Sequence, residues 1–190
     1  MAHVYPPSAV AKVAAVALTF AAVLAPTLSS GAEAEAPGAE SFEGVCEMSG
    51  VIQHEPPLTN EPALAEARGS FSGTCSGEFT DRRGQTRQLD GAPADYRARG
   101  AGELSCLGGT ATGHGRLILE GKHEIEFSLT ERRPAPGLAV VALDGAAGGS
   151  AAVVGTVSES DLLTAGERCS GSGLRRVRGD ARLTSPGISG

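Results

Sequence analysis

The stretch HEIEFSL, residues His123–Leu129, decides the fold class. Its apolar and polar residues alternate: Ile125, Phe127 and Leu129 have one parity, which His123 shares, and Glu124, Glu126 and Ser128 have the other. A period of two with one polar face predicts a half-buried β-strand. Gly121-Lys122 lies just before this stretch and predicts a tight hairpin to a partner strand over Arg116–Glu120.

Short runs of the same kind, bounded by Gly, Pro and Asp, recur along the chain. They are Phe42–Gln53, Gly69–Thr80, Gly100–Leu107, Gly113–Glu120, His123–Glu131, Leu138–Leu143, Ala151–Ser158 and Gly173–Thr184. About eight strands separated by turn residues predict an all-β fold. The expectation is a single antiparallel β-sandwich or β-barrel over residues 42–190.

Two segments are predicted to leave the sheet. Pro56 and Pro57 donate no ladder hydrogen bonds, so the chain from Glu55 to Glu66 is expected to be an exposed loop, with one helical turn over Pro62–Ala67. Asp81–Tyr96 is polar and is expected to be a long surface loop, or a loop with a short edge strand.

The N-terminal segment has the order of a secretory signal. A short region with one cation, Lys12, precedes an apolar run at Val13–Ala25, and small residues allow cleavage after Ala34 or after Ala32. The run has 13 residues, whereas a spanning helix needs about 20. The prediction is a signal peptide over 1–34 and a disordered leader over 35–41.

Net charge limits the class of partner. The full chain carries −6, and removing residues 1–34 takes away one cation and one anion, so the mature charge is unchanged. An acidic protein has no general attraction for nucleic acid or anionic lipid, so neither is expected as a partner. No later apolar run is long enough to span a bilayer.

Four cysteines lie beyond the signal, at Cys46, Cys75, Cys106 and Cys169. An even number in an exported chain predicts two disulfides, with three possible pairings, and the wide spacing argues against zinc. Because successive strands are usually neighbours in space, the expected pairs are Cys46–Cys75 and Cys106–Cys169. The competing pairs are Cys75–Cys106 and Cys46–Cys169.

Charge is distributed unevenly. Residues 35–66 hold seven acids and no Lys or Arg, whereas residues 168–182 hold five arginines and one acid. The favoured interpretation is that the two segments neutralise each other or face solvent. The alternative is an anion-binding strip.

No catalytic, cofactor-binding or metal site is predicted, and no cofactor is expected. His54, His114 and His123 do not form an H-E-x-x-H motif, although His114 and His123 could share a cluster across the predicted hairpin. There is no G-x-S-x-G or phosphate-binding loop. Glu124 and Glu126 lie on the polar face of their strand, which solvation explains.

Three features together resemble small secreted β-rich proteins of high-GC bacteria. They are the signal segment, the Cys46 strand running into Pro56-Pro57-Leu58-Thr59, and Gly73-Thr74-Cys75-Ser76-Gly77. The resemblance covers the first third of the mature chain. It implies secretion and a β fold, and it assigns no functional residue.

The leading functional hypothesis is a secreted, non-catalytic extracellular or cell-envelope binding module. The alternative is a small secreted hydrolase, or an inhibitor of one, with a site around His114, His123 and the acidic strand. A concave pocket that brings one His together with two carboxylates would favour the enzyme. An exposed apolar or charged patch would favour the module.

Overall fold

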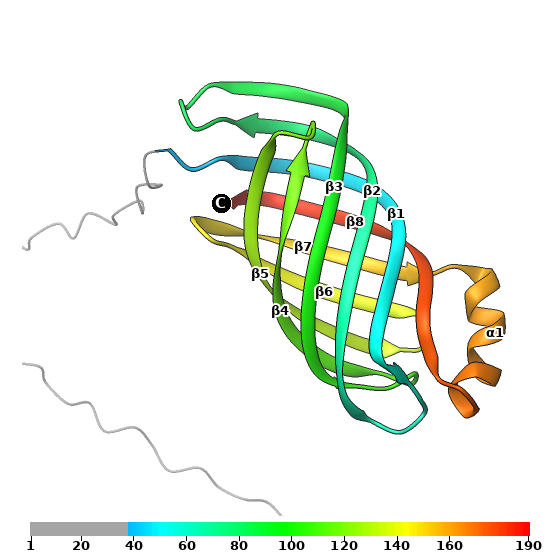
Figure 1. The fold of residues 1–190 in the computed structure, drawn as a ribbon. Helices are drawn as coiled ribbons and strands as arrows, with labels where there is room; N and C mark the ends of the chain where they lie inside the picture. The colour runs from blue at the N-terminus through cyan, green and yellow to red at the C-terminus, as the bar shows by residue number, and fades with distance from the viewer. Residues whose placement is uncertain (1–37) are drawn as a thin grey trace, which may run out of the picture. The chain divides into compact units, whose positions relative to one another are not determined.

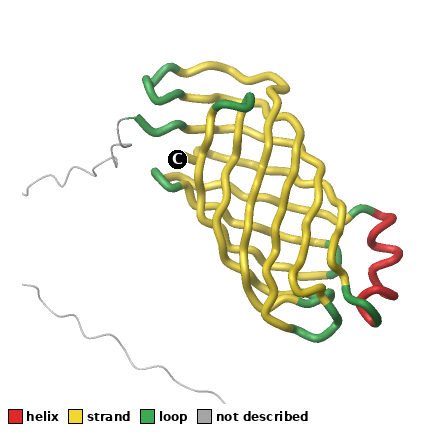
Figure 2. The backbone as a smooth tube through the Cα atoms, in the orientation of Figure 1, coloured by secondary structure: helices red, strands yellow, loops and turns green. Residues whose placement is uncertain are grey.

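Eight antiparallel strands pair in chain order, and the last pairs back with the first, so the sheet closes into a barrel (Figure 1). This computed structural model describes residues 38–190. The strands are β1 (Ser41–Leu58), β2 (Ala63–Thr80), β3 (Thr86–Leu104), β4 (Gly109–Leu119), β5 (His123–Ala135), β6 (Leu138–Gly145), β7 (Gly148–Val157) and β8 (Leu174–Ser189). A helix, α1 (Glu159–Ser170), joins β7 to β8 at one end of the barrel (Figure 2). The all-β prediction is confirmed, and of its two architectures the barrel is the correct one.

The predicted signal peptide and most of the predicted leader lie outside the described residues. The end of the leader belongs to the barrel, which corrects the expectation of disorder there. Ser41 begins β1, and Glu40 is buried and exchanges backbone hydrogen bonds with Gly190.

The alternation that predicted β5 is present in the structure. Ile125, Phe127 and Leu129 point inward and are almost fully buried. Leu119 pairs with His123 across the turn, so the predicted hairpin is confirmed. Burial of one large aliphatic or aromatic side chain stabilises a fold by about 1.5–3 kcal/mol. These residues form a strand because the alternation places all of their large apolar side chains on the buried inward face.

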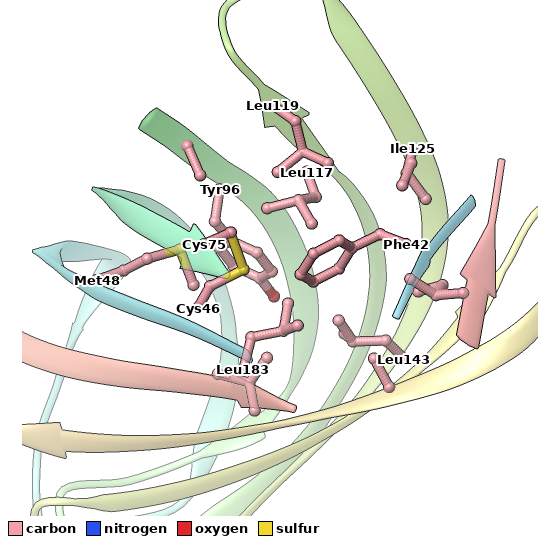
Figure 3. Close-up of a cluster of buried hydrophobic side chains, with 14 of the residues drawn as sticks. Phe42, Cys46, Met48, Cys75, Tyr96, Leu117, Leu119, Ile125, Leu143 and Leu183 are labelled. Carbon is pink, nitrogen blue, oxygen red and sulfur yellow. A yellow bond between two sulfur atoms is a disulfide. The ribbon is translucent and has the colours of Figure 1, made fainter. Parts of the chain in front are cut away.

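The main core fills the end of the barrel opposite α1. Figure 3 shows Phe42, Leu117, Leu143 and Leu183 converging there from four strands, beside the Cys46–Cys75 disulfide. All four side chains are essentially inaccessible to solvent. This end of the barrel is therefore a packed interior.

The exposed loop predicted at Glu55–Glu66 forms only over residues 59–62, so its predicted extent is wrong. β1 continues to Leu58 across a register shift relative to β8, with a cis peptide before Pro56. β2 begins at Ala63, so no helical turn forms there. A strand tolerates proline at such an irregularity because the missing N–H interrupts no ladder hydrogen bond.

The long loop predicted at Asp81–Tyr96 is also wrong. β3 begins at Thr86, and only a short turn separates it from β2. The Asp81 carboxylate accepts the backbone N–H groups of Arg83 and Gln85, which fixes the turn. Leu89, Ala92, Ala94 and Tyr96 point inward from the first part of this strand. The strand therefore has a buried face, but two of these four residues are small alanines.

The helix α1 was not predicted. Its first turn is capped by Ser158, whose hydroxyl accepts the N–H of Asp161, and it holds two acids, Glu159 and Asp161. Such acids favour a helix N-terminus. Within residues 38–190, no helix is long and apolar enough to cross a bilayer.

Both predicted disulfides are confirmed. Cys46 and Cys75 are direct partners in the β1–β2 register, with Cα atoms 4.0 Å apart. Cys106, in the β3–β4 turn, is bonded to Cys169 near the end of α1 across a separation of 63 residues. The first bridge joins adjacent strands, and the second fastens the helix to the barrel end.

The closure of the barrel also accounts for part of the uneven charge. Because β1 pairs with β8, acids of the first segment meet arginines of the last. Arg182 pairs with Glu47 at 2.5 Å and Arg175 with Glu55 at 2.6 Å. The predicted neutralisation is confirmed for these two arginines.

Candidate functional site

The inward face of β5 changes character along its length. After Ile125, Phe127 and Leu129, the next two inward residues are Glu131 and Arg133, whose side chains are each 12% exposed. Buried charges are rare in protein interiors unless they are paired. The polar part of the interior therefore lies toward the α1 end of the barrel.

A cavity occupies this end of the barrel. Its volume is about 80 Å³, and its lining includes Ile52, Leu58, Leu138 and Val177 together with the polar side chains of His54 and Arg133. A second cavity, of about 60 Å³, lies deeper and is lined in part by small residues. Ile52, Phe71, Ala139 and Gly155 border both cavities, so the two adjoin. Eight-stranded barrels commonly have just enough interior for side chains or one small ligand.

Arg133 connects the polar side chains of this site. Its Nε donates to Glu131 Oε1 at 2.5 Å, and its Nη1 lies 3.1 Å from His54 Nε2. A guanidinium has donors and no acceptor, so His54 Nε2 is the acceptor in this contact. The neutral tautomer of His54 consequently carries its proton on Nδ1.

His54 is held in the neutral form. Burial and the nearby positive charge of Arg133 lower its pKa from 6.5 to about 4, and the Leu174 carbonyl opposes the shift more weakly. Its side chain is only 2% exposed. A ring that is neutral at physiological pH accepts from Arg133 and donates from Nδ1.

One buried polar atom of the cluster, Arg133 Nη2, makes no hydrogen bond and belongs to a residue that lines the cavity. His54 Nδ1 lacks a hydrogen bond of good geometry, but the Leu174 carbonyl beside the ring favours its protonated form. An unpaired buried donor costs about 1–3 kcal/mol. The cavity therefore offers a place for an acceptor atom beside Arg133.

Tyr96 closes the inner side of the deeper cavity. Its ring stacks on Phe127 with centroids 5.3 Å apart and meets Phe71 edge to face at 6.2 Å. Burial, together with the negative charge of Glu131, raises the pKa of the Tyr96 hydroxyl. The hydroxyl therefore stays protonated and adds no charge to the site.

The helix α1 lies beside the mouth of the cavity. The side chain of Leu162 approaches Gly137, a cavity-lining residue at which an added Cβ would lie 3.0 Å from a Leu162 methyl carbon. Asp161 accepts the backbone N–H of Arg178 at 2.6 Å. Cys106, which also lines the cavity, is bonded to Cys169 of the helix. The two ends of α1 are thus attached to the barrel at the rim of the cavity.

The histidine cluster predicted from the sequence does not form. His123 lies at the opposite end of the barrel, where its Nδ1 is 2.9 Å from Glu40 Oε1 and its ring packs on Phe79. His114 is exposed on the outer face, and its Nε2 accepts from Arg99. Glu124 points outward and pairs with Arg116. The parity of His123 was predicted correctly, and the shared cluster was wrong.

The sequence reasoning missed the residues that form the site. The sequence places His54 at the edge of a proline-rich segment and predicts that the strand from His123 ends at Glu131, so Arg133 lies outside it. Glu131 and Arg133 have the same parity as Ile125, so the alternation of this strand could have predicted that both side chains point inward. Across the described part of the chain, no group of three or more His, Cys, Asp or Glu side chains is placed to hold a metal ion.

Comparison of this chain with protein-family models, with curated proteins and with solved structures finds no match. The predicted resemblance to secreted β-rich bacterial proteins therefore stays a prediction. The geometry of the barrel interior is the basis for a functional proposal.

Proposed function

We propose that this protein is a secreted, non-catalytic binding module, and that the cavity at the α1 end of its barrel holds a small apolar molecule with one acceptor oxygen. The observation that carries the proposal is the unpartnered buried donor Arg133 Nη2, on a residue that lines a largely apolar cavity. Ligand sites of this type combine apolar walls with a few polar groups that orient the ligand. Two disulfides fit a protein that works in an oxidising compartment.

The charge of the cluster favours an uncharged ligand. Arg133 is already neutralised by Glu131, with which it forms an ion pair at 2.5 Å. A ligand carboxylate would add an uncompensated buried charge, which costs several kcal/mol. A neutral carbonyl group can accept from Arg133 Nη2 without that cost. We therefore propose a ketone, ester or amide carbonyl as the recognised group.

Size restricts the ligand further. The two adjoining cavities have volumes of about 80 and 60 Å³. An engineered cavity of about 150 Å³ is large enough to bind benzene. The expected ligand, or the part of it that enters the barrel, is therefore a single ring or a short branched chain.

A hydrolase gains less support from the same site. His54 faces the cation Arg133, and the cluster contains one carboxylate, Glu131. A pKa of about 4 makes His54 a weak base near neutral pH. The Ser105 hydroxyl lines the cavity but is engaged with the Leu107 and Gly108 backbone in a tight turn. These contacts suit the orientation of a ligand better than the activation of a nucleophile.

The test uses three probes of one shape: cyclohexanone, cyclohexane and cyclohexanecarboxylate. Binding is measured by saturation-transfer NMR and by the shift in melting temperature. Cyclohexanone is expected to bind most tightly, and loss of its carbonyl is expected to weaken binding about fivefold, which corresponds to one net hydrogen bond. Absence of binding by all three probes, with the cavity occupied by water alone, would contradict the proposal.

A matched pair of variants tests whether cyclohexanone binds inside the barrel. Ala139→Leu fills space where the two cavities adjoin, whereas Ala152→Leu adds the same atoms at an exposed position on β7. The first variant is expected to abolish cyclohexanone binding while keeping the circular dichroism of the wild type. The second is expected to bind normally. Equal binding by both variants would locate the ligand outside the barrel interior.

A further inference from the structure

The outer face of the barrel carries basic side chains in two neighbouring rows. In one row, Arg176 of β8, Arg68 of β2 and Arg99 of β3 are aligned by the strand register, with Gln53 of β1 between the first two. In the next row, Arg178, Arg97 and Arg116 are aligned across β8, β3 and β4. We call these six arginines the basic band.

The alignment arises only in the folded barrel. Arg176 and Arg178 come from the C-terminal strand, and the remaining four lie between residues 68 and 116. Closure through the β1–β8 pair brings both groups onto one continuous surface. All six side chains point outward and belong to residues that are exposed.

Most of the band lacks acidic partners. Arg68 pairs with Glu66, and Arg116 pairs with Glu124. Among residues 38–190, no ion pair is formed by Arg97, Arg99, Arg176 or Arg178. Like charges on neighbouring strands repel one another. An anion bound across the band would relieve this repulsion.

The surface under four of the six arginines is also concave. An open hollow of about 570 Å³ is lined by Arg68, Arg97, Arg99 and Arg116, together with His114 and Glu126. Glu126 is the single carboxylate-bearing residue of that lining. The Arg99 Nε donates to His114 Nε2 at 2.7 Å, which holds two of the side chains together over the hollow. A concave surface places several guanidinium groups within reach of one ligand.

We infer that the basic band is a binding site for a linear polyanion that carries repeated phosphate or sulfate groups. Guanidinium groups pair with such oxyanions through two parallel hydrogen bonds. The band crosses five neighbouring strands, which corresponds to about 19 Å at a strand spacing of about 4.8 Å. This length suits several charged groups of a polymer rather than one small ion.

Nucleic acid is the less favoured polyanion. Proteins that bind single strands offer exposed aromatic rings on which bases stack. All five aromatic Phe and Tyr residues in the described chain point into the barrel and are at most 7% exposed: Phe42, Phe71, Phe79, Tyr96 and Phe127. The band supplies charge without a stacking surface. It fits a polymer that has no bases.

The test compares the wild type with two charge-matched double variants. Arg97→Gln with Arg99→Gln removes two unpaired members of the band. The control, Arg83→Gln with Arg132→Gln, removes two exposed arginines that lie outside the band. Neither forms an ion pair among the residues that the structure describes. Binding to inorganic polyphosphate and to dextran sulfate is titrated separately by fluorescence anisotropy at low salt. Single-stranded DNA of equal charge is the third titrant.

The wild type is expected to bind polyphosphate or dextran sulfate, and the tighter of the two identifies the class of anion. The variant of the band is expected to bind about tenfold more weakly, which is the loss of two charge-assisted contacts of about 0.7 kcal/mol each. The control variant is expected to retain wild-type affinity. Equal losses in both variants, no binding of either polymer, or tighter binding of DNA would each overturn the inference. Arg178 and Arg99 border the two cavities as well as the band, whereas Arg97 borders neither cavity. Cyclohexanone binding by the band variant is therefore measured alongside polyanion binding, and unchanged cyclohexanone binding shows that either proposal can fail alone.

Discussion

The neutral His54 makes the stability of the barrel depend on pH in a defined window. Its pKa is about 4 in the folded protein and 6.5 in the absence of the fold. A depressed folded pKa contributes stability that is present above the unfolded value and is lost as the pH falls toward the folded value. Between pH 7 and pH 4.5 the unfolded chain binds a proton at this residue and the folded chain does not. The linkage relation then predicts a loss of about 2 kcal/mol in the free energy of unfolding.

The assay is urea unfolding with intact disulfides at pH 7 and at pH 4.5. His54→Gln is the test variant, because a glutamine carbonyl can still accept from Arg133 and does not titrate. His114→Gln is the control, since His114 is exposed on the outer face. The wild type and the control are expected to lose about 2 kcal/mol more than His54→Gln over this range. Equal losses in all three proteins would refute a neutral, buried His54.

Three further predictions concern stability. Replacing Cys106 and Cys169 by Ala opens a link of 63 residues, and we expect a loss of about 4 kcal/mol on the chain-entropy model, measured by urea unfolding. Leu183→Ala removes an inaccessible core side chain and should cost about 2–5 kcal/mol, whereas Leu163→Ala, at a residue 77% exposed, should change stability by less than about 0.5 kcal/mol. In Gly73→Ala the new Cβ would lie 2.0 Å from a carbonyl oxygen of the neighbouring strand, so we expect a clearly lower melting temperature. Wild-type stability in any of these core or bridge variants would contradict the packing described.

The sequence predicted the strands whose burial alternates without interruption. His123–Leu129 is one, because each inward residue is large and apolar. The first part of β3, before Gly100, was missed because its inward positions include Ala92 and Ala94, and its outward residues are polar, so the buried face has little hydrophobic contrast. The helix was missed although Ser158 and Asp161 have the spacing of an N-terminal cap. The helical pattern after Ser158 is short, and the apolar strand before it favoured an all-β interpretation of this region.

The candidate site was beyond the reach of local patterns for a different reason. Arg133 and His54 are 79 residues apart, and their contact depends on where the barrel closes. Pro56 and Pro57, two and three residues after His54, suggested a loop, and the register shift that accommodates them cannot be read from composition. The Cys46–Cys75 pair was accessible because adjacency along the chain matches adjacency in the sheet, and Cys106–Cys169 then followed as the remaining pair. The polar cluster could be predicted only by knowing how the strands close into a barrel.

The pairing of β1 with β8 has a consequence for behaviour in concentrated solution. An open sheet exposes a row of unpaired N–H and C=O groups on each outermost strand, and such rows recruit strands from other molecules into aggregates. In this sheet every strand is flanked on both sides by its neighbours. A chain with 18-residue strands would otherwise present long templates for intermolecular pairing. Closure removes most of those templates, although residues 86–93 of β3 have a ladder partner on β2 alone. Resistance to fibril formation is therefore expected to last as long as the β1–β8 seam remains intact.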